Sequence, residues 1–349
     1  MSSINLPKPE KILIVRTDRI GDVVLSTPVI RNLRENFPKS YIAFMCRPYT
    51  KDILIGNPYL DEVIVYDKYG KDKSWLNSIR FSFYLRRKKF DWAIILHPTN
   101  RAHLITFFAN IPVRVGWDKK LGFLLTERIP HQKDKGEKHE LDYNLELLKI
   151  LGLKIYSREV FIPLCKDSEK WAEDFFKNYN LDTDKDKIVG LGIGASCPSK
   201  IWPPSYFAHL ARLLREELGV KILVIAEERE RNLTEEFKEN FKEEFIDLTG
   251  KLDLPKIFSL FRRLSLFIGN DSGLIHIGWG LGVGVISIFG RNDAGLSPQR
   301  WKPLGSNSYY FHKDLGCNPC LAHNCKKDFL CLKKIYPEEV FSLAKKLIC

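Results

Sequence analysis

The sequence predicts an α/β protein of two tandem domains, each built on a parallel β-sheet with helices on both faces. Short apolar, β-branched runs alternate with longer helix-like segments at the spacing of βαβ units. The pattern pauses after Pro163, where the highly charged stretch 166–187 follows, and then restarts. A chain of 349 residues can hold two such domains. We therefore expect domains at 1–163 and 164–335, with a final segment at 336–349.

The first domain is expected to begin with a strand at Lys11–Val15, a polar loop at 16–22 and a helix at 23–36. Pro28 falls in the first turns of that helix, where its missing N–H does little harm. The loop lacks the glycine-rich fingerprint of dinucleotide-binding proteins. The same alternation predicts strands at 41–46, 63–66, 92–96 and 113–116, and helices at 50–56, 75–87, 102–109 and 141–151.

The second domain repeats this plan. Its pattern predicts strands at 188–193, 220–225 and 245–248, and helices at 168–179, 203–218, 231–239, 254–264 and 336–348. The stretch 266–290 adds two apolar strands around the polar turn Asn270-Asp271-Ser272-Gly273, which opens another helix. Free N–H groups and the helix dipole make such a helix start an anion site. A capped helix of any α/β protein is the alternative.

Ligands of parallel α/β sheets bind beyond the carboxyl ends of the strands, so the loops there hold the candidate residues. Asp22 follows the first strand, where its carboxylate can accept a proton from a hydroxyl nucleophile or simply cap the helix. The second domain offers Lys200, Glu228, Gly250 and the helix start at 271–273. This set fits a nucleoside diphosphate, although Lys200 could equally be a surface lysine and Glu228 a first-turn helix acid.

Composition narrows the classes of partner. Lys and Arg number 55 and Asp and Glu 43, a net charge of +12, which suits nucleic acid, an anionic membrane surface or a phosphorylated substrate. Nucleic acid is not expected, because the aromatic residues fall in apolar runs and not along a basic groove. We find no signal peptide and no apolar run of about 18 residues. A cytoplasmic protein with reduced thiols is expected.

Four cysteines lie close together near the end of the chain: Cys317, Cys320, Cys325 and Cys331. Four thiolates could hold a structural zinc ion, but the C-x2-C-x4-C-x5-C spacing differs from the two C-x2-C pairs of a zinc ribbon. Reduced thiols that pack a loop, or disulfides formed on oxidation, are the alternatives. His323 lies inside this cluster and His312 just before it, but no set of a base with an orienting partner is apparent, so nucleophilic catalysis by these cysteines is not expected.

Four stretches together resemble the ADP-heptose lipopolysaccharide heptosyltransferases of glycosyltransferase family nine, and the resemblance covers nearly the whole chain. They are KILIVRTDRIGDVVLSTPVIRNLRENFP at 11–38, GASCPSKIWPPSYFAHLARLL at 194–214, FIGNDSGLIHIGWGLGVGVISIFG at 267–290, and the cysteine pattern at 317–331. The resemblance implies a GT-B fold, in which two Rossmann-like domains face a cleft and the final helix packs back on the first domain. It also implies inverting transfer of heptose from ADP-heptose to the inner core of lipopolysaccharide, without a metal for the chemistry or any other cofactor.

The resemblance assigns roles by position. Asp22 matches the catalytic carboxylate. The residues that match the donor-binding positions are Ser196, Lys200, Glu228, Leu252, Asp271, Ser272, Gly273, Leu274 and His276. The sequence departs from the family at AEERERN, which lacks Gly-Gly-Pro before the acid Glu228, and at Ala195-Ser196-Cys197, where many members have more hydroxyl residues.

The basic first domain is expected to hold the anionic acceptor, with Arg16, Arg19, Arg47 and Arg101 as candidates. The acceptor places the enzyme in the cytoplasm, in peripheral contact with the inner membrane. Two alternatives stay open. One is a member of the same family that uses another nucleotide sugar or another glycan acceptor, and the other is a non-catalytic nucleotide-binding protein of the same fold.

Overall fold

A computed structural model describes residues 6–349 of the chain. The described residues form two compact units: the segment that ends at residue 134 with 138–163, and residues 135–137 with 164–349. Each unit is built on one six-stranded sheet, and all the strand pairs are parallel. The sequence prediction of parallel sheets in two Rossmann-like units is therefore confirmed.

The first sheet has the strand order β3-β2-β1-β4-β5-β6. Its strands in chain order are β1 (Lys11–Val15), β2 (Tyr41–Cys46), β3 (Glu62–Val65), β4 (Trp92–Ile95), β5 (Val113–Asp118) and β6 (Glu127–Pro130). Side chains alternate between the two faces of a strand, so both faces of the central strands need cover. Leu13 and Val15 of β1 join one apolar core with Phe81 of α3 and Ile105 of α4.

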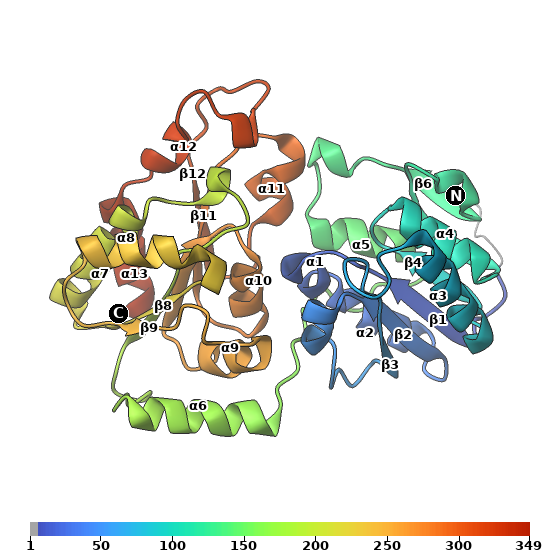
Figure 1. The fold of residues 1–349 in the computed structure, drawn as a ribbon, viewed down its shortest axis with the longest axis horizontal. Coiled ribbons are helices and arrows are strands. Elements are labelled where there is room, and N and C mark those ends of the chain that lie inside the picture. The colour runs from blue at the N-terminus through green and yellow to red at the C-terminus, as the bar shows by residue number, and fades with distance from the viewer. Residues whose placement is uncertain (1–5) are drawn as a thin grey trace. The chain divides into compact units, whose positions relative to one another are not determined.

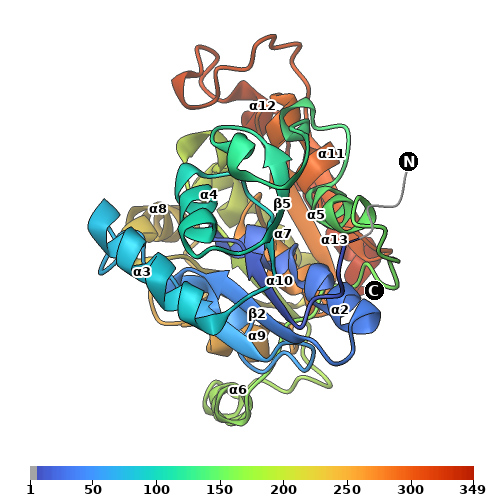
Figure 2. The ribbon, with the colours of Figure 1, turned by 90° about the vertical axis from the view of Figure 1, so that its right-hand side faces the viewer.

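Helices pair on the two faces of this sheet, α3 with α4 and α2 with α5 (Figures 1 and 2). The helices of the first unit are α1 (Ile20–Val24), α2 (Thr27–Asn36), α3 (Trp75–Lys88), α4 (Asn100–Phe108) and α5 (Glu140–Lys149). Short 3₁₀ turns lie between the elements of the chain: η1 (Pro48–Ile53), η2 (Gly122–Leu124), η3 (Lys133–Lys135), η4 (Pro198–Lys200), η5 (Glu228–Glu230), η6 (Ala294–Leu296) and η7 (Ala322–Asn324).

The second sheet repeats the order of the first, as β12-β11-β10-β7-β8-β9. Its strands are β7 (Ile188–Gly192), β8 (Lys221–Ile225), β9 (Ile246–Asp247), β10 (Leu266–Asn270), β11 (Val285–Phe289) and β12 (Ser308–His312). The helices of this unit are α6 (Lys166–Asn178), α7 (Pro204–Leu218), α8 (Arg231–Asn240), α9 (Leu254–Phe261), α10 (Gly273–Gly280), α11 (Pro298–Trp301), α12 (Leu330–Lys333) and α13 (Pro337–Ile348).

The final helix corrects one expectation. The resemblance implied that it packs back on the first domain, but α13 packs along α7 in the second unit. Its buried side chains Val340 and Ala344 join the core that Trp202 and Phe207 also fill. The indole N–H of Trp202 donates to the carbonyl of Ile335, 2.9 Å away, at the entrance to α13. The apolar side chains of α13 thus pack within the second unit.

Two further differences have simple physical reasons. The helix expected at 23–36 is broken, because α1 ends at Val24 and α2 starts at Thr27, with Pro28 in its first turn. Strands β6 and β12 were not predicted, since their sequences ERIP and SYYFH are only half-buried edge strands and lack an apolar run. Within residues 6–349, none of the helices combines the length and the apolar character that crossing a bilayer requires.

Candidate active site

The strand order reverses at one place in each sheet, between β1 and β4 in the first unit and between β7 and β10 in the second. Loops that follow such neighbouring strands diverge and leave a crevice, which is where open α/β sheets bind ligands. In both units a polar contact joins the two loops. Asp18, after β1, lies 3.4 Å from the Nδ1 atom of His97, after β4. Lys200, after β7, lies 2.6 Å from the carboxylate of Asp271, after β10.

Arg16 is the hub of the first site. Its side chain is 1% exposed, and each end of the guanidinium meets a carboxylate. Nε lies 3.0 Å from Asp18, one terminal nitrogen pairs with Asp22, and the other lies 2.8 Å from Glu140. We expected Arg16 to bind the acceptor, but these contacts turn it into the protein, where it orients the loop carboxylates.

A second cation completes this network from the far side. Glu140, at the first turn of α5, is fully buried and also accepts a hydrogen bond from Lys133 Nζ at 2.8 Å. Asn144, one helical turn later, accepts from both cations and donates to the carbonyl of Leu25 at 3.1 Å. Leu25 lies at the break between α1 and α2, so the network fixes that break. A buried carboxylate between two cations is strongly held, and removal of one partner is costly.

Two carboxylates of this network reach solvent: Asp22 and, with a side chain that is 12% exposed, Asp18. Asp22 occupies the first turn of α1, and its side chain is 17% exposed. One carboxylate oxygen pairs with Arg16, and the other accepts from the backbone N–H of Arg19 at 3.3 Å. The capping contact that the sequence allowed is therefore present, although it is long. The ion pair with Arg16 is an additional constraint that a plain helix cap does not need.

Burial perturbs the titration of two neighbours of Asp22. Loss of solvent raises the pKa of Asp18 to about 6, although the Arg16 guanidinium opposes this shift. Desolvation lowers the pKa of His97, and the charges of Arg16 and Lys133 lower it further. His97 is consequently neutral at pH 7, so it can accept or donate a hydrogen bond at the edge of the site without adding charge.

The other arginines expected at the acceptor side have different surroundings. Arg19 is exposed. Arg47 stacks between two tyrosine rings, with its guanidinium carbon 4.4 Å from the centre of Tyr49 and 4.5 Å from that of Tyr69. Arg101 donates to the carbonyls of residues 72 and 73, so it ties down the loop before α3.

The second site lies at the start of α10. Ser272 is the N-cap residue, and Gly273 and Leu274 begin the helix. Lys200 also donates to the backbone carbonyl of Asp271 at 3.1 Å, so its ammonium is held beside the helix N-terminus. Arg291, which sequence reasoning missed, lies 3.5 Å from the same carboxylate and is 7% exposed. The sequence signal that could have identified Arg291 is its position in the loop directly after the apolar run 283–289 and Gly290.

Asn270 locks the two loops of this site together. It is fully buried, accepts from the N–H of Trp202 at 2.9 Å and donates to the carbonyl of Ile193 at 2.8 Å. His276 is buried one turn into α10. The remaining predicted residues are accessible, since Ser196 is exposed on the loop after β7 and Leu252 is half-buried before α9.

Glu228 sits differently from the expectation. Both of its carboxylate oxygens pair with Arg231, and the side chain lies over Gly250, whose φ of +69° favours glycine. Glu230 is the acid that touches the loop after β7. Its carboxylate accepts from the N–H of Glu227 at 2.9 Å and lies 2.0 Å from the place of a Cβ atom at Gly194. Burial raises the pKa of Glu230.

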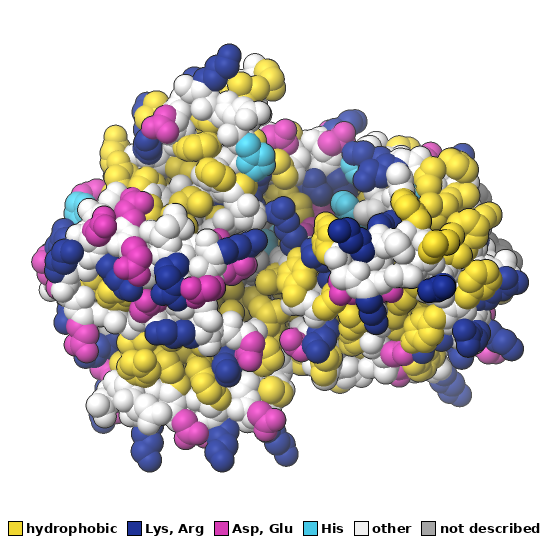
Figure 3. Space-filling model, in the orientation of Figure 1, with side chains coloured by type: hydrophobic (Ala, Val, Ile, Leu, Met, Phe, Trp, Pro, Cys, Tyr) yellow, Lys and Arg dark blue, Asp and Glu magenta, His cyan; other side chains and the backbone are white. Residues whose placement is uncertain are grey.

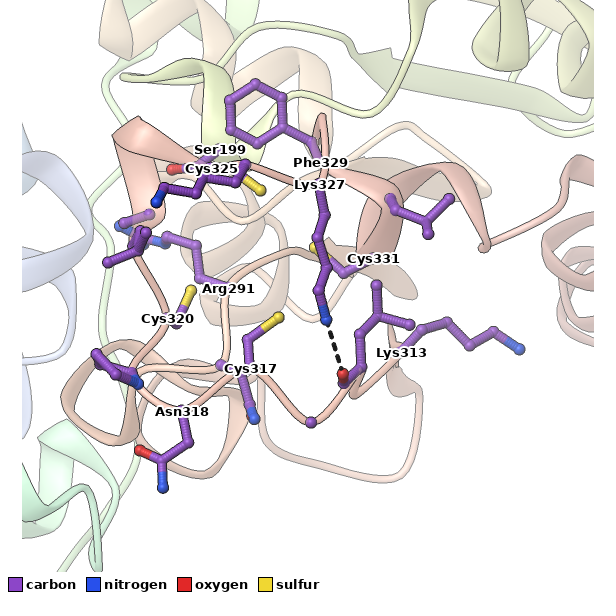
Figure 4. A pocket seen from close by; sticks show the side chains of 18 residues that line it. Ser199, Arg291, Lys313, Cys317, Asn318, Cys320, Cys325, Lys327, Phe329 and Cys331 are labelled. Carbon is purple, nitrogen blue, oxygen red and sulfur yellow. Dashed lines mark hydrogen bonds between the residues drawn. The ribbon is translucent and has the colours of Figure 1, made fainter.

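The four clustered cysteines line one pocket of about 320 Å³ together with Arg291, Lys313 and Lys327 (Figure 4). Burial raises the pKa of the Cys331 thiol, and the charges of Cys325 and Cys320 add to this shift. All four are free thiols. In the described part of the chain, no group of three or more His, Cys, Asp or Glu side chains is arranged to hold a metal ion.

Comparison with known proteins identifies the family. The family model for glycosyltransferase family 9 (heptosyltransferase) matches residues 79–330. The chain belongs to glycosyltransferase family 9. Lipopolysaccharide heptosyltransferase 2 of Salmonella typhimurium is 24% identical over 299 residues, which cover 82% of this chain and 85% of that protein.

Two solved structures extend the match to nearly the whole chain. A family 9 glycosyltransferase from Veillonella parvula superposes with a TM-score of 0.87 at 25% identity and covers 97% of both chains. The ADP-heptose lipopolysaccharide heptosyltransferase II of E. coli gives a TM-score of 0.78 at 20% identity and covers 97% of this chain and 98% of its own. The protein is thus a family 9 glycosyltransferase with the GT-B fold, as the sequence motifs predicted.

Proposed function

We propose that this family 9 enzyme transfers heptose from ADP-heptose to the inner core of lipopolysaccharide, with inversion at the anomeric carbon and with Asp22 as the general base. The observation that carries the proposal is the ion-paired, solvent-reaching carboxylate of Asp22 beyond β1 in a chain of this family. The named activity of the Salmonella relative and the ADP-heptose in the name of the E. coli structure support the choice of substrates.

The chemistry assigned to Asp22 follows from its surroundings. An acceptor hydroxyl gives its proton to a carboxylate oxygen while its oxygen attacks the anomeric carbon from the face opposite the departing group. The bond from that carbon to the phosphate oxygen breaks, and ADP leaves with the electron pair. Arg16 holds the carboxylate in one orientation throughout, because Glu140 and Asp18 fix the guanidinium on its other sides.

The second unit supplies the stabilisation of the leaving group. The free N–H groups at the start of α10 and the ammonium of Lys200 favour the negative charge that develops on the diphosphate. Arg291 adds a third donor beside Asp271. The other donor contacts that we propose, from the family positions, involve Ser196, Glu228, Leu252, Asp271, Ser272, Gly273, Leu274 and His276. For Glu228, the ribose hydroxyls would have to compete with Arg231.

The acceptor side rests on exposed cations. Arg19 and Arg47 are placed to meet a phosphate-rich and carboxylate-rich glycan near Asp22, whereas Arg16 and Arg101 hold the protein itself. Such an acceptor is anchored by its lipid part, so we propose that the enzyme works at the cytoplasmic face of the inner membrane in peripheral contact with it.

The test combines a panel of nucleotide sugars with a panel of core acceptors, and mass spectrometry of the products. The proposal expects transfer of heptose from ADP-heptose, and NMR of the product should show the anomeric configuration opposite to that of the donor. Transfer of a different sugar, or transfer to a glycan other than the inner core, would assign the chain another activity within the family. Retention of configuration would exclude direct attack with Asp22 as base.

A further inference from the structure

Helix α3 carries an apolar stripe on its outward side. Its inward side chains Ser78, Phe81, Ser82 and Leu85 are buried against the first sheet. The outward positions Leu76, Ile79 and Phe83 follow each other at helical spacing and are 71%, 37% and 49% exposed. Exposure of such a stripe to water does not stabilise the fold, and contiguous exposed apolar patches mark interaction sites. We therefore expect a partner to cover the stripe.

The stripe continues onto neighbouring elements. Helix α4 packs beside α3, and the turn η2 packs beside α4. Phe107 and Phe108 at the end of α4 are both 43% exposed, and Phe123 on η2 is 67% exposed. We call the set Leu76, Ile79, Phe83, Phe107, Phe108 and Phe123 the apolar face. Hydrophobic side chains gather with Lys and Arg over the region where Figure 1 draws α3 and α4 (Figure 3).

Positive charge surrounds the apolar face. Residues 73–117 contain eight Lys and Arg and a single carboxylate, Asp91, whose oxygen is used by the backbone N–H groups of residues 10 and 11. Asp118, beside Gly122 of η2, pairs with Arg128 at 3.4 Å. Arg80 and Arg87 flank the stripe on α3, and both are exposed. Among the described residues, no carboxylate lies within ion-pairing distance of either guanidinium. Trp75 and Tyr84, ring types that favour the lipid headgroup level, are 51% and 42% exposed at its edges.

We propose that the apolar face docks on the surface of a bilayer that contains anionic lipids. Leu76, Phe83 and Phe123 enter the boundary between headgroups and acyl chains, and Arg80 and Arg87 meet the lipid phosphates. A helix face with bulky apolar side chains in the centre and cations at the rim, and without acids, matches this surface in shape and in charge. The proposed function explains why the enzyme would meet a membrane. The choice of the docking face rests on the apolar face and its cations alone.

The test is co-sedimentation of the full-length protein with vesicles of phosphatidylcholine and phosphatidylglycerol, or of phosphatidylcholine alone. Wild type should bind the anionic vesicles and bind less as salt rises. The double variant Leu76→Glu with Phe83→Glu should lose about tenfold or more in vesicle affinity, since two buried apolar side chains become charged. The control Leu321→Glu changes a leucine that is 47% exposed in the second unit and should bind as wild type.

Substitution of two arginines tests the contribution of the positive charge around the apolar face. Arg80→Ser with Arg87→Ser should lose about tenfold in affinity for anionic vesicles and depend less on salt. The matched control, Lys170→Ser with Lys177→Ser, removes two exposed cations from α6 and should change little. If the glutamate variants destabilise the fold, Leu76→Ser with Phe83→Ser gives the same readout without new charges.

Three outcomes would overturn the proposal: no binding of wild type to anionic vesicles, equal binding by the Leu76 and Phe83 variants, or equal loss in the controls. Light scattering, which measures the oligomeric state, tests whether a second copy of the chain covers the apolar face instead. If wild type is a dimer that the Leu76 and Phe83 variants dissociate, the face is covered by a second copy and the membrane proposal fails. Transfer to a water-soluble core oligosaccharide should be unchanged in these variants. Failure of transfer in wild type would refute the proposed function and leave the vesicle result untouched.

Discussion

The two units share one strand order, but the loops at the point where that order reverses carry side chains of opposite charge. Among the described residues, the first site sets three carboxylates around the cations Arg16 and Lys133, and the second sets two cations around Asp271. The first site therefore keeps a surplus carboxylate at the surface, and the second keeps a surplus cation beside a helix N-terminus. The same scaffold thus offers a proton acceptor in one unit and an anion holder in the other, and the loop residues decide which.

The largest effect should come from removing the surplus carboxylate of the first site. Asp22→Asn keeps the shape but loses the base, so we expect kcat to fall by about 10²- to 10⁴-fold. Isothermal titration should find ADP-heptose binding within about twofold of wild type, because the donor residues are in the other unit. Transfer by Asp22→Asn at the wild-type rate would leave the side chain as a helix cap and end the comparison between the sites.

Glu140→Gln tests whether the buried network supports that site. The substitution leaves two buried cations without their shared carboxylate, so the free energy of unfolding should fall by about 3–5 kcal/mol. Urea denaturation measures this loss. Glu146→Gln, on the same helix, breaks an exposed pair with Lys138 at 2.7 Å and should cost less than about 1 kcal/mol. Equal losses would mean that burial of the network contributes nothing special.

Substitution of Lys200 tests the role of the positive charge at the second site. Lys200→Met removes the ammonium beside the start of α10, and we expect the Kd for ADP to rise by about 10- to 100-fold. Calorimetry with ADP alone isolates this effect from the chemical step. Lys256→Met removes an ammonium that lies 3.7 Å from Asp253 on α9 and serves as the control. An unchanged Kd in Lys200→Met would place the diphosphate elsewhere.

A further expected effect concerns the stability of the first unit towards acid. Burial lowers the pKa of His103, on α4, from 6.5 to about 4. The unfolded chain therefore binds a proton more readily below pH 6.5, and stability present above that pH is lost as pH falls towards 4. His103→Leu should remove about 2–3 kcal/mol of the pH dependence between pH 7 and pH 4 in urea denaturation. His323→Leu changes an exposed histidine of the second unit and serves as the control.

The repeated architecture was readable from the sequence because the central strands are buried on both faces and so appear as unbroken apolar runs. The edge strands β6 and β12 escaped because exposure leaves them without that pattern. The positions of Asp22, Lys200 and Asp271 followed from loops after strands, together with the family motifs. Their partners could not be predicted in the same way. Glu140 meets Arg16 across 124 positions of sequence, and no local pattern encodes such a contact.

The same limit explains the acids after β8. Sequence position favoured Glu228, but the side chain that touches the loop of Gly194 is Glu230, because a capping contact at η5 turns it back towards Glu227. The burial of Arg16 was also beyond sequence reasoning. A loop arginine near an acceptor site looks available until the helix that neutralises it, α5, is placed beside it.

The packing of α13 on α7 has a consequence for how the protein is made. The first unit has nearly all of its residues once the ribosome has passed Pro163, so it can fold while the second half is still being synthesised. The second unit lacks Val340 and Ala344 of its core until α13 has been synthesised. A chain interrupted before α13 would therefore carry a folded first unit joined to a second unit with an open apolar core, which chaperones and proteases recognise.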